Sequence, residues 1–272
     1  MSLTVQSTFR FVHGAALVDQ VLAWISEKVV HAARRPLIVG VSAPQGAGKT
    51  TLVRQLLPLL EARGLRAVGV SIDDFYLRRE EQLALAAAHA GNPYLEHRGY
   101  PGTHDVALGV RTLEALRAGG EVQLPRYDKS AHGGRGDRSP RTERVVGPFD
   151  VVLLEGWMLG FTPVPTGDPL LQVINTKLAA YESWYSLIDV MVCLRAEDPL
   201  FVLKWRVEAE EAARASGRPA LSRTDIEDYI RRFLPAYELY ADTVAHGRWH
   251  PDHQLALTLN ELRLPERELG RE

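Results

Sequence analysis

The chain has 272 residues, of which 46% are hydrophobic and 24% are charged, a composition that can bury the core of one large α/β domain or of a core with appended pieces. The formal net charge of -2 excludes an overall basic field that would attract nucleic acid or a membrane surface. The single cysteine, Cys193, excludes an internal disulfide. The first residues lack the basic and apolar regions of a signal peptide, and no apolar run is long enough to span a bilayer, so we expect a cytoplasmic protein.

In chain order, an N-terminal helical segment over residues 1–35 comes first, because apolar residues recur at three- and four-residue steps between residues 16 and 33. Short runs rich in Val, Ile and Leu then alternate with stretches of helical spacing. The runs predict strands at 37–42, 66–72, 150–155, 187–194 and 253–259. The stretches between them predict helices at 49–61, 80–90 and 106–117, and Pro58 is expected to kink the first of these or to end a turn.

This alternation is typical of a parallel sheet that is covered by helices on both faces. We therefore predict a three-layer α/β fold with a central, mainly parallel sheet, in a single domain over residues 1–272. Ligands bind such sheets at the carboxyl ends of the strands. The polar motifs of this chain follow predicted strands, so we expect them to meet at one edge of the sheet.

A glycine-rich turn, APQGAGKT, lies between the first predicted strand and the helix at 49–61, with the spacing of a Walker A loop (P-loop). Gly46 and Gly48 allow the backbone N–H groups to turn inward and form a nest for phosphate. Lys49 can reach the β- and γ-phosphates, and the Thr50 hydroxyl can bind Mg²⁺. Ala43 stands where the consensus has Gly, which is tolerated if its φ is negative. The predicted nucleotide-binding residues are Ala43, Pro44, Gln45, Gly46, Ala47, Gly48, Lys49, Thr50 and Thr51.

Two acids, Asp73 and Asp74, end the next predicted strand in VSIDDFYL. Phosphoryl transfer to an alcohol needs an oxygen acceptor that orients the hydroxyl and takes its proton. Adjacent side chains point in different directions, so one acid should face the substrate while the other serves metal, water or structure. Glu155 ends the hydrophobic run DVVLLE, and together with Thr50 it is predicted to hold Mg²⁺ through oxygen ligands. The predicted catalytic residues are thus Lys49, Asp73 and Asp74.

Four blocks, SIDDFYL, RGYPGTHD, PRYDKSAHGGRGDR and LEGWMLGF, together resemble the D-glycerate 3-kinase family, which lies within the P-loop kinases that also contain phosphoribulokinase, uridine kinase and bacterial pantothenate kinase. The resemblance runs from about Pro36 to Tyr240, in the family's order. It implies a P-loop NTPase fold, ATP as phosphoryl donor, Mg²⁺ as cofactor and a small hydroxylated acceptor. It also implies that Asp73 is the base, because Asp73 lies two residues before the first aromatic residue of the motif; Asp74 is the second candidate.

A carboxylate acceptor such as D-glycerate needs Arg, Lys or backbone donors in its pocket. We predict that residues 91–149 form the acceptor-binding and mobile loop region, with Asp105 capping the next helix. The Gly- and Arg-rich part of it, residues 133–144, is expected to be an exposed loop or lid. The predicted substrate contacts in this region are Arg98, His104, Arg126, Tyr127 and Lys129.

A lid is predicted over residues 195–220. Lys204 and Arg206 lie on a predicted helix there. Kinases often carry such cations on a lid that closes over the transferring phosphate. Lys and Arg on a helix surface are also commonly only solvated, and this alternative stays open.

The sequence therefore predicts a Mg²⁺- and ATP-dependent phosphotransferase with an alcohol group as acceptor, in the first place converting D-glycerate to 3-phosphoglycerate. A related kinase for pantothenate, a nucleoside or another sugar acid is an alternative. A nucleotide-dependent switch or binding module is a further one, although a switch has no need for an acid pair with a polar acceptor loop. The expected partner is a small molecule; nucleic acid is not expected without a basic stripe, nor is a membrane, and the oligomeric state is left open.

Overall fold

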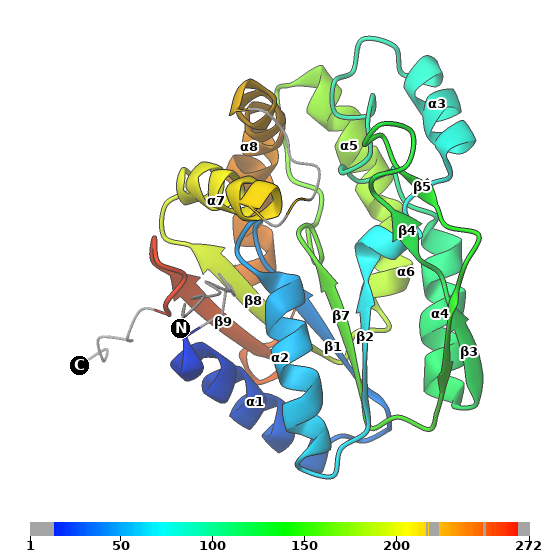
Figure 1. Ribbon diagram of the computed structural model, residues 1–272, viewed down its shortest axis with the longest axis vertical. Helices are drawn as coiled ribbons and strands as arrows, with labels where there is room; N and C mark the ends of the chain where they lie inside the picture. The colour runs from blue at the N-terminus through cyan, green and yellow to red at the C-terminus, as the bar shows by residue number, and fades with distance from the viewer. Residues whose placement is uncertain (1–13, 216, 218–222, 247–248, 266–272) are drawn as a thin grey trace, which may run out of the picture.

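The computed structural model describes residues 14–215, 217, 223–246 and 249–265 of the chain (Figure 1). Residues 1–13 of the predicted N-terminal segment lie outside the described residues. The same holds for residue 216 and residues 218–220 of the predicted lid.

A five-stranded parallel sheet forms the centre of the molecule, with the strand order β2-β7-β1-β8-β9. Because every neighbouring pair is parallel, the carboxyl ends of the strands meet at one edge, which lies at the top of Figure 1. This confirms the predicted fold class. The strands are β1 (Leu37–Ser42), β2 (Ala67–Ser71), β7 (Val151–Gly156), β8 (Val190–Ala196) and β9 (Gln254–Leu259).

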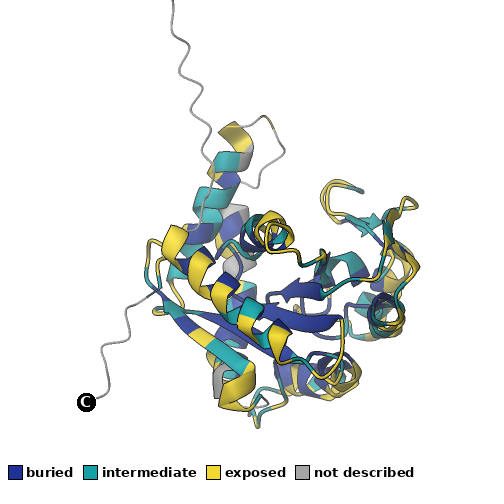
Figure 2. Cartoon of the chain, turned by 90° about the horizontal axis from the view of Figure 1, so that it is seen from below, coloured by how far each residue is buried: buried dark blue, intermediate teal, exposed yellow. Residues whose placement is uncertain are grey.

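Two hydrophobic cores flank the sheet, because successive side chains of a strand point to opposite faces. Along β1, Ile38 packs into one core whereas Val39 packs into the other. The core of Ile38 is covered by α4 (Val106–Ala118), α5 (Pro169–Leu178) and α8 (Arg223–His246). The core of Val39 is covered by α1 (Ala15–Val30), α2 (Lys49–Glu61) and α7 (Phe201–Ala215). Figure 2 shows the buried strands lying between the exposed outer faces of the helices.

The helices begin and end close to their predicted bounds. α2 runs from Lys49 to Glu61, and Pro58 lies within it without ending it. α3 (Arg79–Ala88) matches the helix predicted at 80–90. Asp105 is the N-cap of α4, where its side chain accepts a hydrogen bond from the N–H of Leu108 at 2.9 Å, as expected.

Residues 119–150 contain short antiparallel pairs that the sequence did not predict. β3 (Glu121–Leu124) pairs with β6 (Glu143–Val146), and β4 (Tyr127–Asp128) pairs with β5 (Asp137–Arg138). Strands of two residues leave no periodic pattern in a sequence. The segment at 133–144, which contributes to these pairs, is also rich in Gly and Arg rather than in apolar residues. Part of the expected loop at 133–144 is therefore paired backbone.

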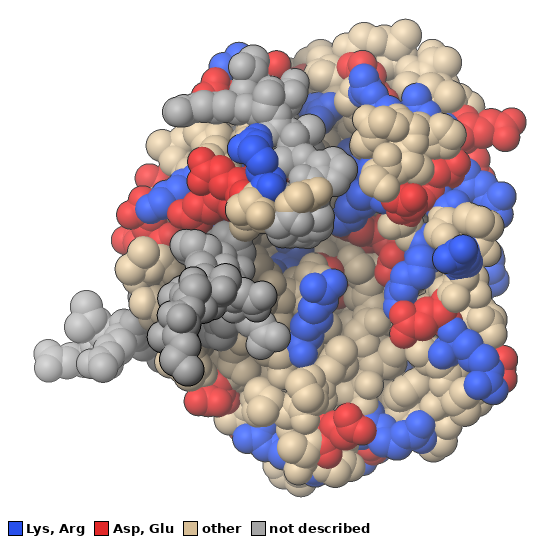
Figure 3. All heavy atoms as spheres, in the orientation of Figure 1, with Lys and Arg blue, Asp and Glu red and all other residues tan. Residues whose placement is uncertain are grey.

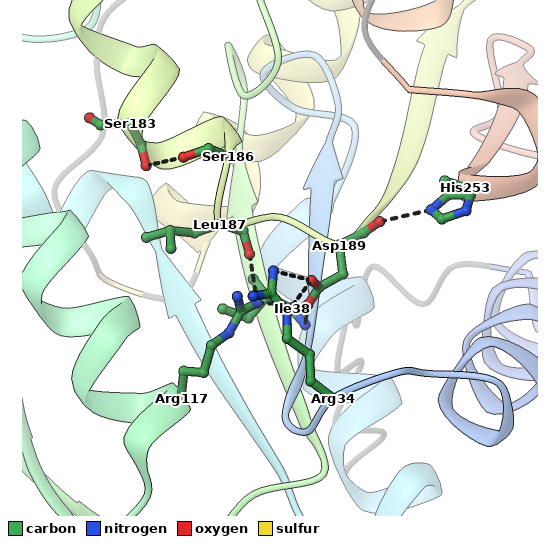
Figure 4. A network of polar contacts seen from close by, with 8 residues as sticks. All are labelled: Arg34, Ile38, Arg117, Ser183, Ser186, Leu187, Asp189 and His253. Carbon is green, nitrogen blue, oxygen red and sulfur yellow. Dashed lines mark hydrogen bonds and ion pairs between the residues drawn. The ribbon is translucent and has the colours of Figure 1, made fainter.

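The amino ends of the strands carry a polar network centred on Asp189, drawn in Figure 4. Its Oδ1 accepts hydrogen bonds from Arg34 Nε at 3.2 Å and Nη2 at 3.0 Å. Its Oδ2 accepts from Arg117 Nη2 at 2.7 Å and from the Ile38 N–H at 2.8 Å. This network, called the amino-edge network below, ties the start of β1 and the end of α4 to the start of β8.

Candidate active site

The P-loop, residues 43–50, runs from the end of β1 into α2. Gly48 is the N-cap of α2 at φ 89°, and Gly46 also has a positive φ, 79°, a conformation that favours glycine. A Cβ added at Gly46 would lie 2.8 Å from the Cβ of Trp205, so α7 requires glycine here. Ala43 is buried and is not among the described non-glycine residues with positive φ, which explains why alanine is tolerated.

The side chain of Lys49 is folded into the P-loop, where its Nζ donates a hydrogen bond to the carbonyl oxygen of Pro44 at 3.1 Å. Burial lowers the pKa of Lys49, while the carboxylates of Glu155 and Asp73 act in the opposite direction. The ammonium group therefore lies among the acids of the site, where it can contact phosphate oxygens.

Thr50 and Glu155 lie in direct contact beside the P-loop. The Thr50 hydroxyl donates to Glu155 Oε1 at 2.9 Å, and Glu155 is 6% exposed. Burial raises the pKa of Glu155, whereas the charge of Lys49 lowers it. In the described parts of the chain, no group of three or more His, Cys, Asp or Glu could hold a metal. The oxygen pair of Thr50 and Glu155 fits Mg²⁺, which needs only one or two protein ligands beside phosphates and water.

The two candidate acids lie in the short 3₁₀ helix η1 (Ile72–Phe75), and Asp74 is fully paired there. Its Oδ2 accepts from Arg126 Nη1 at 2.7 Å, and its Oδ1 accepts from the Tyr127 N–H at 3.0 Å. Burial raises the pKa of Asp74, and Arg126 and Tyr127 oppose this shift. Both carboxylate oxygens of Asp74 therefore hold β4 against η1.

Asp73 has a different environment. Its Oδ2 lies 2.5 Å from Lys129 Nζ, and its side chain is 25% exposed. Burial would raise the pKa of Asp73, but the cations of Lys129 and Lys49 outweigh it and lower the pKa to about 2. Asp73 is thus an ionised carboxylate near the P-loop lysine, where it can accept a hydrogen bond from a hydroxyl group.

His104 is brought opposite Tyr76, which directly follows η1, by backbone pairing. The segment 103–105 pairs with residues 75–77, through the Leu77 N–H to Thr103 O (2.9 Å) and the Asp105 N–H to Phe75 O (2.7 Å). The imidazole is buried, and burial lowers its pKa to about 4 although the charge of Asp73 raises it. The ring is therefore neutral at pH 7.

The other predicted acceptor-binding residues have different partners in the structure. Lys129 contacts Asp73, as described above. Arg98 donates to the carbonyl oxygens of Gly134 (3.0 Å) and Arg135, and its guanidinium lies 5.6 Å from the centroid of the Tyr127 ring. Besides its contact with Asp74, Arg126 forms an ion pair with Glu143, in which Arg126 Nη2 lies 2.6 Å from Glu143 Oε2. Arg98 and Arg126 are therefore engaged in holding the loop together.

The two predicted lid cations also differ. Lys204 Nζ pairs with Glu261 in the loop after β9 at 2.7 Å, and the indole N–H of Trp205 donates to the Glu261 carbonyl at 2.8 Å. Arg206 pairs with Glu210 at 2.5 Å, and its charge acts on the ammonium of Lys49. Of the two predicted lid cations, Lys204 and Arg206, it is therefore Arg206 that lies on the side of α7 facing the P-loop.

Three residues that sequence reasoning missed help to build the site. Arg138 donates to Tyr76 O at 3.0 Å and to Asp105 Oδ2 at 3.3 Å. It belongs to the block PRYDKSAHGGRGDR, in which nothing in the sequence distinguishes it from the other Arg residues. Arg263 donates from Nε to Gly46 O at 3.0 Å. Tyr181 contacts His104. Tyr181 and Arg263 come from distant segments outside every quoted motif, so no local signal marks them.

A cavity of about 230 Å³ borders the first P-loop residues between β8, α7 and α8, and its lining includes Pro44, Arg195 and Tyr237. None of Lys49, Asp73 and Glu155 lines it. The chemistry of the site therefore lies on the other side of the P-loop, along the ends of β2 and β7.

On the face shown in Figure 3, acidic side chains are interspersed with the Lys and Arg side chains, so the described residues form no continuous basic stripe there. Within the described residues, no helix combines the length and apolar character needed to cross a bilayer.

Comparison with known proteins supports the family indicated by this geometry. The Phosphoribulokinase / Uridine kinase family matches residues 38–163, which include the P-loop and the acids. The chain is 44% identical over 245 residues to D-glycerate 3-kinase, chloroplastic, from Arabidopsis thaliana, a match that covers 85% of this chain and 54% of that protein, or about half of its length. It is 34% identical to "Uncharacterized kinase mug58" from Schizosaccharomyces pombe, covering 92% of this chain and 96% of that protein.

The solved structure of D-glycerate 3-kinase from Cryptococcus neoformans var. grubii superimposes with a TM-score of 0.85 at 30% identity, over 94% of this chain and 99% of that one. The match thus covers far more of the chain than the P-loop and the strands beside it. The chain therefore belongs to the D-glycerate 3-kinase family of P-loop kinases.

Proposed function

We propose that this chain is an ATP-dependent kinase that transfers the γ-phosphoryl group of ATP to the 3-hydroxyl of D-glycerate, giving 3-phosphoglycerate and ADP. The observation that carries the proposal is Asp73, an ionised carboxylate in contact with Lys129 and in the field of Lys49. The names of the relatives from A. thaliana and C. neoformans support D-glycerate as the acceptor.

In this reaction Asp73 accepts a hydrogen bond from the acceptor hydroxyl and takes its proton. The hydroxyl oxygen forms a bond to the γ-phosphorus while the bond from this phosphorus to the β,γ-bridging oxygen breaks, and the electron pair leaves with ADP. Lys49 and the P-loop N–H groups stabilise the charge of the transferring group. Lys129 would bind the acceptor carboxylate, and this contact would release Asp73 from its ion pair.

Thr50 and Glu155 would hold Mg²⁺. The ion would supply neutralisation of charge on the β- and γ-phosphates. Arg206 on α7 would add a cation over the same phosphates, and closure of the lid would exclude water and so limit futile hydrolysis of ATP. The ion pair of Lys204 with Glu261 supports a role for Lys204 in anchoring α7.

The same proposal covers the organisation of the chain: one kinase domain over 1–272, with acceptor binding in 91–149 and the lid in 195–220. We place it in the cytoplasm or a similarly reducing compartment, which the buried free thiol of Cys193 supports. The A. thaliana relative is named as chloroplastic.

The test is a screen of acceptors by ADP release, with D-glycerate, pantothenate, uridine and gluconate, and identification of the product by ³¹P NMR. We expect acceleration with D-glycerate and a product phosphorylated on the 3-oxygen. No acceleration with D-glycerate contradicts the proposal. Acceleration by another acceptor alone would indicate a related kinase, and slow hydrolysis unaffected by any acceptor would indicate a switch.

A further inference from the structure

His104 carries a buried polar atom that has no partner. The residue is 5% exposed, and its Nε2 makes no hydrogen bond in the structure. A buried donor or acceptor without a partner is rare and costs stability, so it needs an explanation. Because the ring of His104 stacks on Tyr76, which directly follows η1 and packs against Tyr127, His104 lies on the acceptor side of the site.

Tyr181, at the end of the 3₁₀ helix η2 (Ala179–Tyr181), determines which ring nitrogen of His104 bears the proton. Its phenolic oxygen accepts a hydrogen bond from the backbone N–H of Gly102 at 2.9 Å. His104 Nδ1 lies 2.8 Å from the same oxygen. Tyr181 is buried, and among the described residues His104 Nδ1 is the acceptor within hydrogen-bond distance of its hydroxyl, so the hydroxyl donates its own proton to Nδ1 and is not left unpaired. The neutral ring therefore carries its proton on Nε2.

The ring cannot turn this proton away. It stacks on Tyr76 with centroids 4.3 Å apart and packs in a T-shaped arrangement against Trp184 with centroids 5.8 Å apart. The preceding turn is equally fixed, since Gly102 has a φ of 99° and a Cβ there would lie 2.1 Å from Lys177 Cδ. His104 thus presents a rigid, uncharged N–H donor next to Tyr76, at the end of the segment that carries Asp73.

We propose that the Nε2–H of His104 binds the 2-hydroxyl oxygen of the acceptor, and that Tyr181 is the positioning residue that sets the tautomer for this contact. The inference rests on the proposed function, since in D-glycerate the 2-oxygen is the oxygen nearest to the reacting 3-hydroxyl. A site built to hydrogen-bond one substrate group rejects an analogue that lacks the group, because its own buried donor then stays unpaired. His104 therefore makes the enzyme selective for a 2,3-dihydroxy acid over a 3-hydroxy acid.

The tautomer is tested first, without substrate, by ¹⁵N NMR of the histidine side chains at pH 7. In the wild type we expect the His104 Nδ1 signal at the position of an unprotonated nitrogen and the Nε2 signal at that of a protonated one. Tyr181→Phe should shift population toward the Nδ1–H form. Tyr240→Phe is the matched control, because it removes a buried hydroxyl that bonds Asn175 at 2.9 Å, away from His104. A wild-type ring protonated on Nδ1, or a ring unaffected by Tyr181→Phe, overturns the role of Tyr181.

The contact itself is tested by the ratio of kcat/KM for D-glycerate to that for 3-hydroxypropionate, which lacks the 2-hydroxyl. We expect His104→Phe to reduce this ratio about tenfold to a hundredfold. His104→Gln should retain part of it, since its amide offers an N–H near the Nε2 position. Tyr181→Phe should reduce it by less than His104→Phe, with the KM for ATP unchanged. A ratio that survives in both His104 variants overturns the proposal.

The two levels of the proposal fail separately. A wild-type enzyme that does not phosphorylate D-glycerate contradicts the proposed function, whatever the tautomer is. An active enzyme that uses D-glycerate and 3-hydroxypropionate equally well contradicts only the contact from His104.

Discussion

Asp189 and Asp73 lie at opposite edges of the central sheet, and both contact cationic side chains. In the amino-edge network, each oxygen of Asp189 accepts two hydrogen bonds (Figure 4). At the carboxyl edge, Lys129 contacts Oδ2 of Asp73, and the neighbouring His104 keeps an unpaired Nε2. The carboxylate of Asp189 is thus paired at both oxygens within the protein, although the Nε of Arg117 is unpaired, whereas the ring of His104 has an unpaired atom beside the acid pair of the site. Buried polar groups that a fold leaves incomplete are those that can bind a ligand, because the ligand completes them.

The same contrast separates the two adjacent acids of the site. Asp74 resembles Asp189, with both oxygens paired to Arg126 and to a backbone N–H. This distinction supports the proposal that Asp73 is the base and that Asp74 has a structural role. The following predictions test the contrast from the largest expected effect to the smallest.

The largest effect should follow Asp73→Asn. The amide cannot take the proton of the hydroxyl, so kcat should fall by roughly 10²–10⁴-fold, while the affinity for ATP and the unfolding midpoint stay close to those of the wild type. Steady-state kinetics measures kcat, nucleotide titration measures the affinity for ATP, and thermal unfolding gives the midpoint. Asp74→Asn is the matched control: unlike Asp73→Asn, it should lower the unfolding midpoint, because Arg126 loses one of its two carboxylate partners. Near-normal turnover of Asp73→Asn would move the base to Asp74 or elsewhere.

The second effect concerns the lid. Arg206→Ala should lower kcat about 10²-fold, since a cation on the transferring phosphoryl group is removed. Lys204→Ala should change kcat no more than a few-fold, because Lys204 pairs with Glu261. The comparison is made at saturating ATP and D-glycerate, together with ATP hydrolysis in the absence of acceptor. Equal losses in the two variants contradict the assignment of Arg206 alone to the site.

A third experiment breaks the amino-edge network. Asp189→Asn leaves Arg117, whose side chain is 16% exposed, without its charged partner, so the free energy of unfolding in urea should drop by about 3 kcal/mol. At temperatures where the variant is folded, kcat should match the wild type. Glu121→Gln removes an exposed ion pair with Arg144 and should leave the unfolding midpoint unchanged. A loss of kcat without loss of stability would show that the two edges are not separate.

The smallest effect concerns pH. The pKa of His104 is about 4 in the folded protein, below its ordinary value of 6.5. Between these values the unfolded chain binds a proton that the folded protein does not, so stability is complete above pH 6.5 and decreases as the pH falls toward 4. The contribution is at most about 3 kcal/mol. His104→Gln should flatten this part of the profile of unfolding free energy against pH; an unchanged slope contradicts the neutral state of the ring.

The sequence by itself determined the fold and the nucleotide end of the site. Strand and helix periods, the spacing APQGAGKT and the acids at strand ends are local patterns, and parallel strands bring their carboxyl ends together without further information. For this reason β1, α2 and the parallel sheet were predicted close to their observed bounds.

Only the tertiary structure decided how the polar groups pair. The guanidinium groups of Arg98 and Arg126 could bind a carboxylate substrate, yet Arg98 donates to loop carbonyl oxygens and Arg126 donates to Asp74. Tyr181 and Arg263 reach the site from segments that carry no motif. A side chain's chemistry is local, whereas the partners that pair with it come from across the fold, and these partners give the adjacent acids Asp73 and Asp74 different environments.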